Sequence, residues 1–183
     1  MELAQAREAL RYLRAVQALR ASAGSGEGFV ASVIGRSPLP SQQTILINRG
    51  REHGLQDDVI VVDASGVVGR IIEAHRATSL AMLLTDPNSR VAGVVERSGE
   101  SGLLVGQGTG LCQFIYLDAD ADIVEGDRVV TAGLGRVFPK RGLWLGTVIN
   151  VSRDRQAGSA TAVVRPDAKL GRVQEVLCLV PSS

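Results

Sequence analysis

The feature that most constrains the fold is a β-rich unit that occurs twice. Residues 44–74 read TILINRGREHGLQDDVIVVDASGVVGRIIEA, in which short β-branched runs alternate with polar, Gly-containing turns. This pattern predicts consecutive antiparallel strands. A second copy runs to residue 151, with Asp127 aligned on Asp58, Gly146-Thr-Val-Ile on Gly69-Arg-Ile-Ile, and a longer middle loop at 134–145. Two related β-units predict two small barrels or sandwiches packed together.

The remaining chain adds strands around these units, so the predicted fold class is all-β. A Pro-containing turn at 85–88 marks the domain boundary, which gives a first antiparallel barrel at 29–88 and a second at 89–183. The final strand, at 173–180, either closes the second barrel or returns to the first. Further strands are expected at 29–34, 79–84, 91–97, 102–105, 113–117 and 160–164.

Residues 1–23 form the one helical segment that the sequence predicts. They contain strong helix formers, no Gly and no Pro, and a 24–28 linker rich in Gly and Ser follows. Leu3, Leu10 and Leu13 keep the spacing of a coiled-coil seam, which predicts a dimerisation segment. The alternative is an amphipathic helix packed on its own domain. The Arg-rich polar side suits anionic lipid headgroups or simply water.

Composition excludes several classes of function. With 20 basic and 19 acidic residues the net charge is +1, and three Phe, two Tyr and one Trp offer few stacking surfaces, so nucleic acid is not an expected partner. No stretch approaches the roughly 18 apolar residues of a membrane span, so this chain is expected to be soluble. Cys112 and Cys178 lie in apolar runs and are expected to be buried free thiols.

One pattern points to catalysis. His53, Asp86 and Ser101 follow the chain order of chymotrypsin-like proteases, and Ser101 stands in a Gly-Glu-Ser-Gly turn. A two-barrel serine protease is therefore an alternative function. The chain is short for that class, and a Gly/Ser hairpin turn needs no further explanation, so we expect no enzymatic activity.

No cofactor or metal is expected. The Asp118–Asp122 run has Ile123 and Val129 where a calcium loop needs Gly and Glu. The Gly-rich 106–110 segment precedes a strand and not a helix, so it lacks the features of a phosphate loop. His53 and His75 have no further ligand at zinc spacing.

A recognition surface is the remaining candidate site. The 134–145 loop combines aromatic, apolar and basic residues, which are typical of partner surfaces. Alternatively, its aromatic residues plug the barrel mouth or the seam between the domains. The predicted partner-binding residues are Phe138, Lys140, Arg141, Leu143 and Trp144.

Several motifs, taken together and in order, resemble the MreC family of bacterial rod-shape-determining proteins. They are VIGRSP (33–38), TILINRGREHGL (44–55), GVVGRIIEA (66–74), LLTDPNSRVAGVVERSG (83–99), GLLVGQG (102–108), the segment 115–151 and VVRPDAKLGRVQEVLCLV (163–180). Departures are His53, where an acidic residue is usual, and Ser41-Gln42, which replace an aromatic residue.

The resemblance implies an N-terminal membrane anchor, absent from this chain, a helical dimerisation segment and two six-stranded barrels on the periplasmic side of the cytoplasmic membrane. It implies a non-enzymatic scaffold of the cell-elongation machinery that maintains cell shape. The implied partners are a second copy, the penicillin-binding transpeptidase, MreB and MreD. A generic dimeric β-barrel adaptor is the other non-enzymatic alternative.

Overall fold

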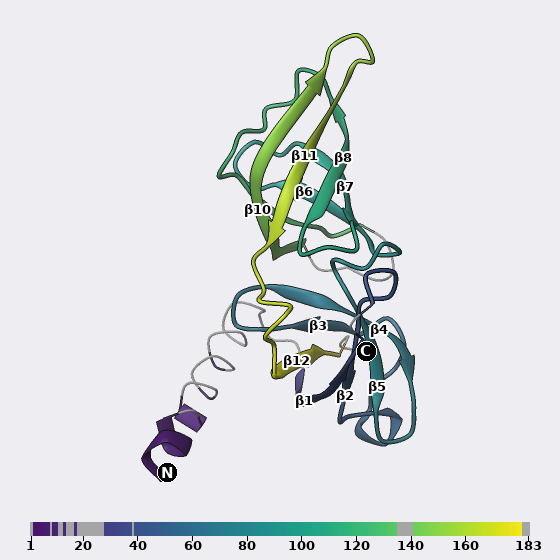
Figure 1. Ribbon diagram of the computed structural model, residues 1–183, viewed down its shortest axis with the longest axis vertical. Coiled ribbons are helices and arrows are strands. Elements are labelled where there is room, and N and C mark those ends of the chain that lie inside the picture. The colour runs from purple at the N-terminus through teal and green to yellow at the C-terminus, as the bar shows by residue number, and fades with distance from the viewer. Residues whose placement is uncertain are drawn as a thin grey trace.

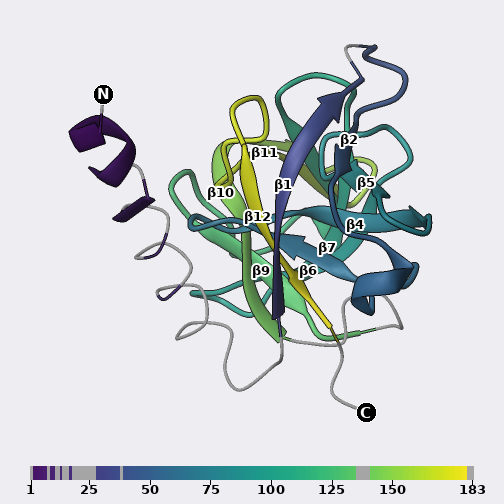
Figure 2. The ribbon, with the colours of Figure 1, turned by 90° about the horizontal axis from the view of Figure 1, so that it is seen from below.

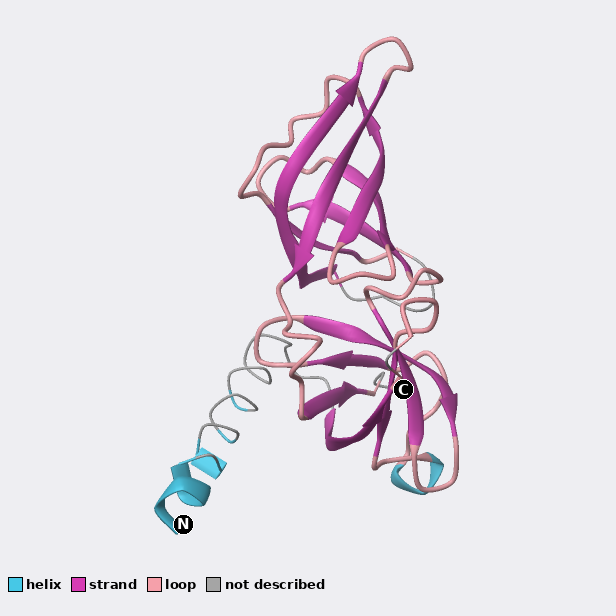
Figure 3. Cartoon of the chain, in the orientation of Figure 1, coloured by secondary structure: helices cyan, strands magenta, loops and turns pink. Residues whose placement is uncertain are grey.

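The protein consists of two closed barrels of six antiparallel strands, stacked along the long axis of the molecule (Figure 1). The computed structural model describes residues 2–7, 9, 10, 13, 17, 28–37, 39–134 and 141–180. The described residues before residue 28 are helical (Figure 3). The predicted fold class is therefore confirmed.

The first barrel takes strands from both ends of the chain. Its order is β1-β12-β3-β4-β5-β2, and the ring is closed. The strand whose placement the sequence left open, β12, lies between β1 and β3, and Figure 2 shows β1 and β12 side by side. The strands are β1 (Gly28–Arg36), β2 (Thr44–Ile47), β3 (Ile60–Val62), β4 (Val67–Ala74), β5 (Ser79–Leu83) and β12 (Glu175–Leu179), with a 3-10 turn η1 (Arg51–His53) between β2 and β3.

The second barrel is continuous in sequence and closes in the order β10-β11-β8-β7-β6-β9. Its strands are β6 (Arg90–Val95), β7 (Ser101–Gly106), β8 (Cys112–Asp118), β9 (Arg128–Ala132), β10 (Arg141–Asp154) and β11 (Ser159–Pro166).

The two barrels share one topology. If β12 is counted as the first strand of the first barrel, then β12-β1-β2-β3-β4-β5 have the same neighbours as β6-β7-β8-β9-β10-β11, strand for strand. The first barrel is thus a circular permutation of the second. It cannot close until the chain has built the second barrel and returned.

The structure confirms one half of the repeat alignment and corrects the other. Gly69 lies opposite Val61 on β3, and Gly146 lies opposite Val129 on β9, so the glycines are equivalent. Asp58, however, corresponds to Gly126 and not to Asp127, because both have a left-handed backbone (φ 70° and 93°). What recurs is the turn conformation, which Gly and Asp tolerate, and not the carboxylate.

The middle loop of the second copy is shorter than the predicted 134–145. Because β10 begins at Arg141, Leu143 and Trp144 belong to a strand. The pairing of β10 with β9 is irregular there, with register shifts on both sides of Trp144. Such bulges break the alternation of apolar and polar residues from which the strand could have been recognised.

Buried aliphatic side chains from both barrels form one hydrophobic cluster. Phe114 is fully buried in the second barrel, as are Val61 and Ile71 in the first. Cys112 and Cys178 are buried free thiols, as expected, and burial raises the pKa of each to about 12. Neither thiol is therefore ionised at neutral pH.

The barrels meet at glycines that allow close approach of two backbones. A Cβ on Gly66, in the β3–β4 turn, would lie 2.6 Å from the carbonyl oxygen of Trp144 in the second barrel. Gly108 has a left-handed φ of 75°, and a Cβ there would lie 2.7 Å from the carbonyl oxygen of Pro40. The Gly108 N–H also donates to the Thr85 carbonyl at 2.8 Å. The seam is therefore a backbone-to-backbone contact.

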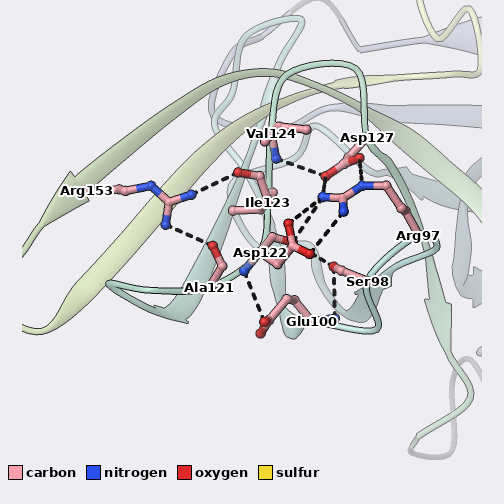
Figure 4. A network of polar contacts seen from close by, with 9 residues as sticks. All are labelled: Arg97, Ser98, Glu100, Ala121, Asp122, Ile123, Val124, Asp127 and Arg153. Carbon is pink, nitrogen blue, oxygen red and sulfur yellow. Dashed lines mark hydrogen bonds and ion pairs between the residues drawn. The ribbon is translucent and has the colours of Figure 1, made fainter.

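A polar network orders the segment between β8 and β9 (Figure 4). The Arg97 guanidinium donates to both carboxylate oxygens of Asp127, at 2.8 and 2.9 Å, and to both of Asp122, at 3.0 and 2.8 Å. Asp127 also accepts from the Val124 N–H at 2.9 Å. Arg153 donates to the carbonyl oxygens of Ala119, Ala121 and Ile123.

Gly66→Ala tests whether the seam requires a glycine. The added methyl group has no room beside a backbone carbonyl, so it strains the β3–β4 turn or separates the barrels. We expect a loss of about 1–3 kcal/mol in unfolding free energy, or a longer distance between spin labels placed one on each barrel. Gly110→Ala is the control, because a Cβ there meets nothing within 4 Å. An alanine at 66 that leaves stability and distance unchanged would contradict the close approach.

The Arg97 network predicts acid-sensitive stability. Hydrogen bonds from Arg97 lower the folded-state pKa of Asp127 and of Asp122 below the ordinary carboxyl value. The network therefore stabilises the fold above the unfolded pKa of about 4, and this contribution is lost as pH falls through the lower folded values.

Asp127→Asn should reduce the melting temperature by about 2–4 °C at pH 7 and by progressively less below pH 4, measured by thermal unfolding across pH. Asp120→Asn, an exposed carboxylate in the same segment, is the control. A difference between wild type and Asp127→Asn that stays constant down to pH 2 would show that the ion pair does not contribute.

Candidate partner-binding site at the seam

A cleft of about 570 Å³ opens where the two barrels meet. The first barrel contributes the end of β1 and the segment leading into β2, and the second contributes the β7–β8 turn and the residues after β11. The lining is mixed, with basic, acidic and apolar side chains. Its members include Arg36, Leu39, Thr44, Thr109, Arg165, Asp167 and Lys169.

Trp144 is held at this seam by a cation and a carboxylate. The Arg128 guanidinium carbon lies 3.8 Å from the centre of the Trp144 ring, and Arg128 Nε lies 3.5 Å from Asp167 Oδ2. The Thr147 hydroxyl donates to the other oxygen of Asp167 at 2.8 Å. Although Arg128 Nε and Asp167 Oδ2 attract each other, both are buried without a hydrogen bond. The indole is thus fixed on one face, and Trp144 remains 45% exposed.

The β3–β4 turn that faces Trp144 is organised by Asp63. One carboxylate oxygen of Asp63 accepts the N–H groups of Ser65 and Gly66 at 2.7 and 3.0 Å. Burial raises the pKa of Asp63, and these two N–H groups, together with the backbone and ammonium of Lys169, act in the opposite direction. The turn is therefore pinned against the segment that follows β11.

Gln43 makes the polar connection on the other side of the cleft. Its N–H donates to Asp86 Oδ2 at 2.8 Å, and its side-chain amide donates to the Gly108 carbonyl at 2.7 Å. The Thr85 hydroxyl donates to the Gln43 amide oxygen. Gln43 of the first barrel therefore links the β5–β6 connection, through Thr85 and Asp86, to the β7–β8 turn, through Gly108.

The predicted recognition residues differ in whether the structure describes them and in how exposed they are. Phe138 and Lys140 lie outside the described residues, and only the backbone of Arg141 is described. Leu143 is 9% exposed and belongs to the core, with its N–H donating to the Thr131 hydroxyl at 3.0 Å. Among the residues that the structure describes, Trp144 is thus the predicted member that solvent reaches.

Arg128, Asp167 and Gln43 were missed as members of the seam. Arg128 and Asp167 fall within the matching segments 115–151 and 163–180, but nothing in those segments shows that the two side chains meet, and Gln43 stands just before the 44–55 motif. Only the folded chain brings them together.

Leu3, Leu10 and Leu13 lie on the N-terminal helical segment and are 67, 52 and 55% exposed. The linker at 24–27 lies outside the described residues. Three exposed leucines at heptad spacing form an apolar stripe that nothing in the described part of this single chain covers.

The serine-protease alternative lacks its geometry. His53 Nδ1 accepts the Gly50 N–H at 3.0 Å, whereas a catalytic histidine donates from this nitrogen to its aspartate. The Asp86 carboxylate accepts the N–H groups of Gln43 and Asn88. Figure 3 shows η1, which carries His53, at the end of the first barrel that points away from the second barrel. Ser101 is the first residue of β7, which belongs to the second barrel. The structure therefore does not bring the three residues together.

The acidic segment between β8 and β9 forms a turn. Asp122 binds Arg97, and within the described ranges no group of three or more His, Cys, Asp or Glu side chains is placed to hold a metal ion. No helix in the described part of the chain is long and apolar enough to cross a membrane.

Comparisons with known proteins agree with this architecture. The model of the rod shape-determining protein MreC barrel core matches residues 33–180. MreC of Listeria monocytogenes is 31% identical over 158 residues, which are 84% of this chain and 53% of that protein. The crystal structure of MreC from Pseudomonas aeruginosa matches with a TM-score of 0.81 at 34% identity, over 84% of this chain and 99% of that one.

A more distant likeness is to the complex between Penicillin-Binding Protein (PBP2) and MreC from Helicobacter pylori. It has a TM-score of 0.65 at 16% identity, over 85% of this chain and 99% of that one, which shows a shared fold. The chain spans 36 to 53% of the length of three curated MreC relatives that it matches. With the matched barrel core covering most of its length, the chain belongs to the MreC family of cell shape-determining proteins.

Proposed function

We propose that the chain is the barrel portion of a non-enzymatic scaffold of the cell-elongation machinery. In this role it maintains cell shape by linking the cytoskeleton and its membrane partners to periplasmic peptidoglycan synthesis. The observation that carries the proposal is the match of both barrels and their connection to the MreC barrel core. The barrels would lie on the periplasmic side, with an N-terminal anchor in the full-length protein.

The absence of catalysis belongs to the proposal. His53 and Asp86 direct their polar atoms to backbone groups of their own barrel and of its connection, so they serve local structure. A scaffold requires rigid surfaces instead of a reactive group, and two closed barrels joined through backbone contacts provide them.

A penicillin-binding transpeptidase is the proposed periplasmic partner. The support is the Helicobacter pylori complex, which joins PBP2 to an MreC of the same fold. On this chain, the proposed contact is the cleft or the adjacent 134–145 segment, where Trp144 is exposed and already oriented by Arg128. Phe138, Lys140 and Arg141 are proposed to join it, and Leu143 supports the strand from inside the barrel. MreB and MreD are proposed partners of the full-length protein.

Self-association through the helical segment is the second proposed contact. An exposed leucine stripe is normally covered in a stable assembly. The spacing of Leu3, Leu10 and Leu13 suits a second copy of the same helix.

Replacing Leu10 and Leu13 with Asp should lower the mass of the assembly measured by sedimentation, because two carboxylates on the stripe cannot be buried against a second helix. Gln5→Asp, outside the stripe, is the matched control. An unchanged mass for the double variant would mean that the helix packs within its own chain or that the barrels alone make the contact.

Trp144→Ala should weaken binding to the periplasmic part of the transpeptidase by about tenfold or more while leaving the melting temperature nearly unchanged. An aromatic side chain buries about 150–250 Å² in total, and a partner would cover the 45% of Trp144 that is exposed in the free chain. Calorimetric titration measures the first quantity and thermal unfolding the second.

Phe138→Ala is tested in parallel, and Ile34→Ala, an exposed residue of the first barrel that does not line the cleft, is the control. A large drop in melting temperature with Trp144→Ala would assign the indole to the seam instead of the partner.

A further inference from the structure

Tyr116, on β8 of the second barrel, combines a strained backbone with an exposed aromatic ring. Its φ is 65°, in the left-handed region that an aromatic residue rarely adopts. Its side chain is 78% exposed, the highest value among the exposed large hydrophobic residues of the described chain. In the part of the chain that the structure describes, the phenol makes no hydrogen bond. The fold therefore gains little from an aromatic side chain at this position.

A β-bulge turns the ring outward. On β11, Ala160 lies opposite Leu117 and Ala162 lies opposite Phe114, so three steps along β8 match two along β11. As a result Phe114 and Leu117 point into the core, and the two residues between them, Ile115 and Tyr116, both face out. Regular alternation would have placed only one of the two outside. Bulges commonly redirect a side chain in this way at functional positions.

The second non-glycine residue with a left-handed backbone has a local explanation. Asp58 stands at the position of the first barrel that Gly126 occupies in the second, and its carboxylate accepts a hydrogen bond from Arg70 at 2.7 Å. Asp is also one of the residues that tolerate this conformation. Tyr116 lies in a bulge, but its side chain makes no such hydrogen bond to the described residues.

The surface around Tyr116 is built from aliphatic and uncharged polar side chains. Leu103 lies directly opposite Ile115 on β7, and both are half-buried outward positions. Thr161 is the outward position of β11 beside the bulge, and Gln113 is the next outward position along β8. The outward positions of β7 and β8, and of β11 up to Val163, contain no Lys or Arg, and Asp118 is their one charge. We call this surface, formed by Leu103, Ile115, Tyr116 and Asp118, the Tyr116 face.

We propose that the Tyr116 face is a docking surface for the transpeptidase, which would present an apolar patch with Lys or Arg at its edge. This inference rests on the proposed function for the identity of the occupant. The centres of protein interfaces commonly hold an aromatic anchor, and Tyr116 with its aliphatic neighbours has this composition. The Asp118 carboxylate favours a partner with Lys or Arg at the edge of its contact. A two-fold contact between two copies of this face would bring their Asp118 carboxylates together, which disfavours a symmetric dimer through it.

The face is separate from the seam. Ser159, opposite Asp118, follows the β10–β11 turn, which Figure 1 shows at the end of the second barrel farthest from the first. Trp144 lies at the opposite end, against Gly66. A partner that engaged both sites would extend along the length of the second barrel.

The test uses the whole chain and the purified periplasmic part of the transpeptidase from the same bacterium. Tyr116→Gly removes the ring and also relieves the backbone strain, because Gly adopts a positive φ without cost. We expect binding about tenfold weaker or more, with a melting temperature equal to or above that of wild type. Tyr116→Phe should bind like wild type, Asp118→Lys should bind more weakly, and Ile34→Ala, an exposed residue of the first barrel, is the control.

Each contrary outcome is distinct. If wild type binds and Tyr116→Gly binds equally well, the Tyr116 face is not the docking surface, although the proposed function stands. A lower melting temperature for Tyr116→Gly would assign the ring a structural role and overturn the inference. If wild type does not bind the transpeptidase, the proposed partner and the inference both fail. A fall in sedimentation mass for Tyr116→Gly alone would make a second copy the occupant and likewise overturn it.

Discussion

Closure of the backbone hydrogen-bond ring in the first barrel is the constraint on which the other features depend. Without β12, strands β1 and β3 would each expose an unpaired edge, and β3 has only three residues with which to hold its place. The chain must therefore leave the first barrel after β5, build the second and come back. Two connections then join the barrels, and both contribute to the cleft.

Two connections cross the seam, and close backbone contacts lie beside the hydrophobic cluster that the two barrels share. Gly66 and Gly108 admit carbonyl oxygens of other segments at distances that a side chain would forbid. Gln43 and the Arg128–Asp167 pair add polar contacts beside them. These contacts orient one barrel relative to the other, which the proposed scaffold function would use.

The comparison of the two permuted barrels separates structural positions from functional ones. Gly69 and Gly146 are equivalent, and each is required because a neighbouring strand carbonyl occupies the space of a Cβ. Asp58 and Gly126 are equivalent because the turn needs a left-handed backbone. Neither explanation applies to Tyr116, and this is why we relate its left-handed backbone to binding of a partner.

The sequence by itself determined the fold class, nearly all the strands, the buried cysteines and the equivalence of the two glycines, because these follow from side-chain periodicity and turn chemistry within short segments. It misaligned Asp58 with Asp127 because what recurs is a left-handed turn, which Gly126 also adopts, and not a carboxylate. It extended the middle loop over Leu143 and Trp144 because bulges there break the alternation. Only the tertiary structure decided the place of β12, the seam around Gln43, Arg128 and Asp167, and the outward turn of Tyr116. Each of these depends on a register or a contact between segments distant in the chain, and local residue patterns do not encode such pairings.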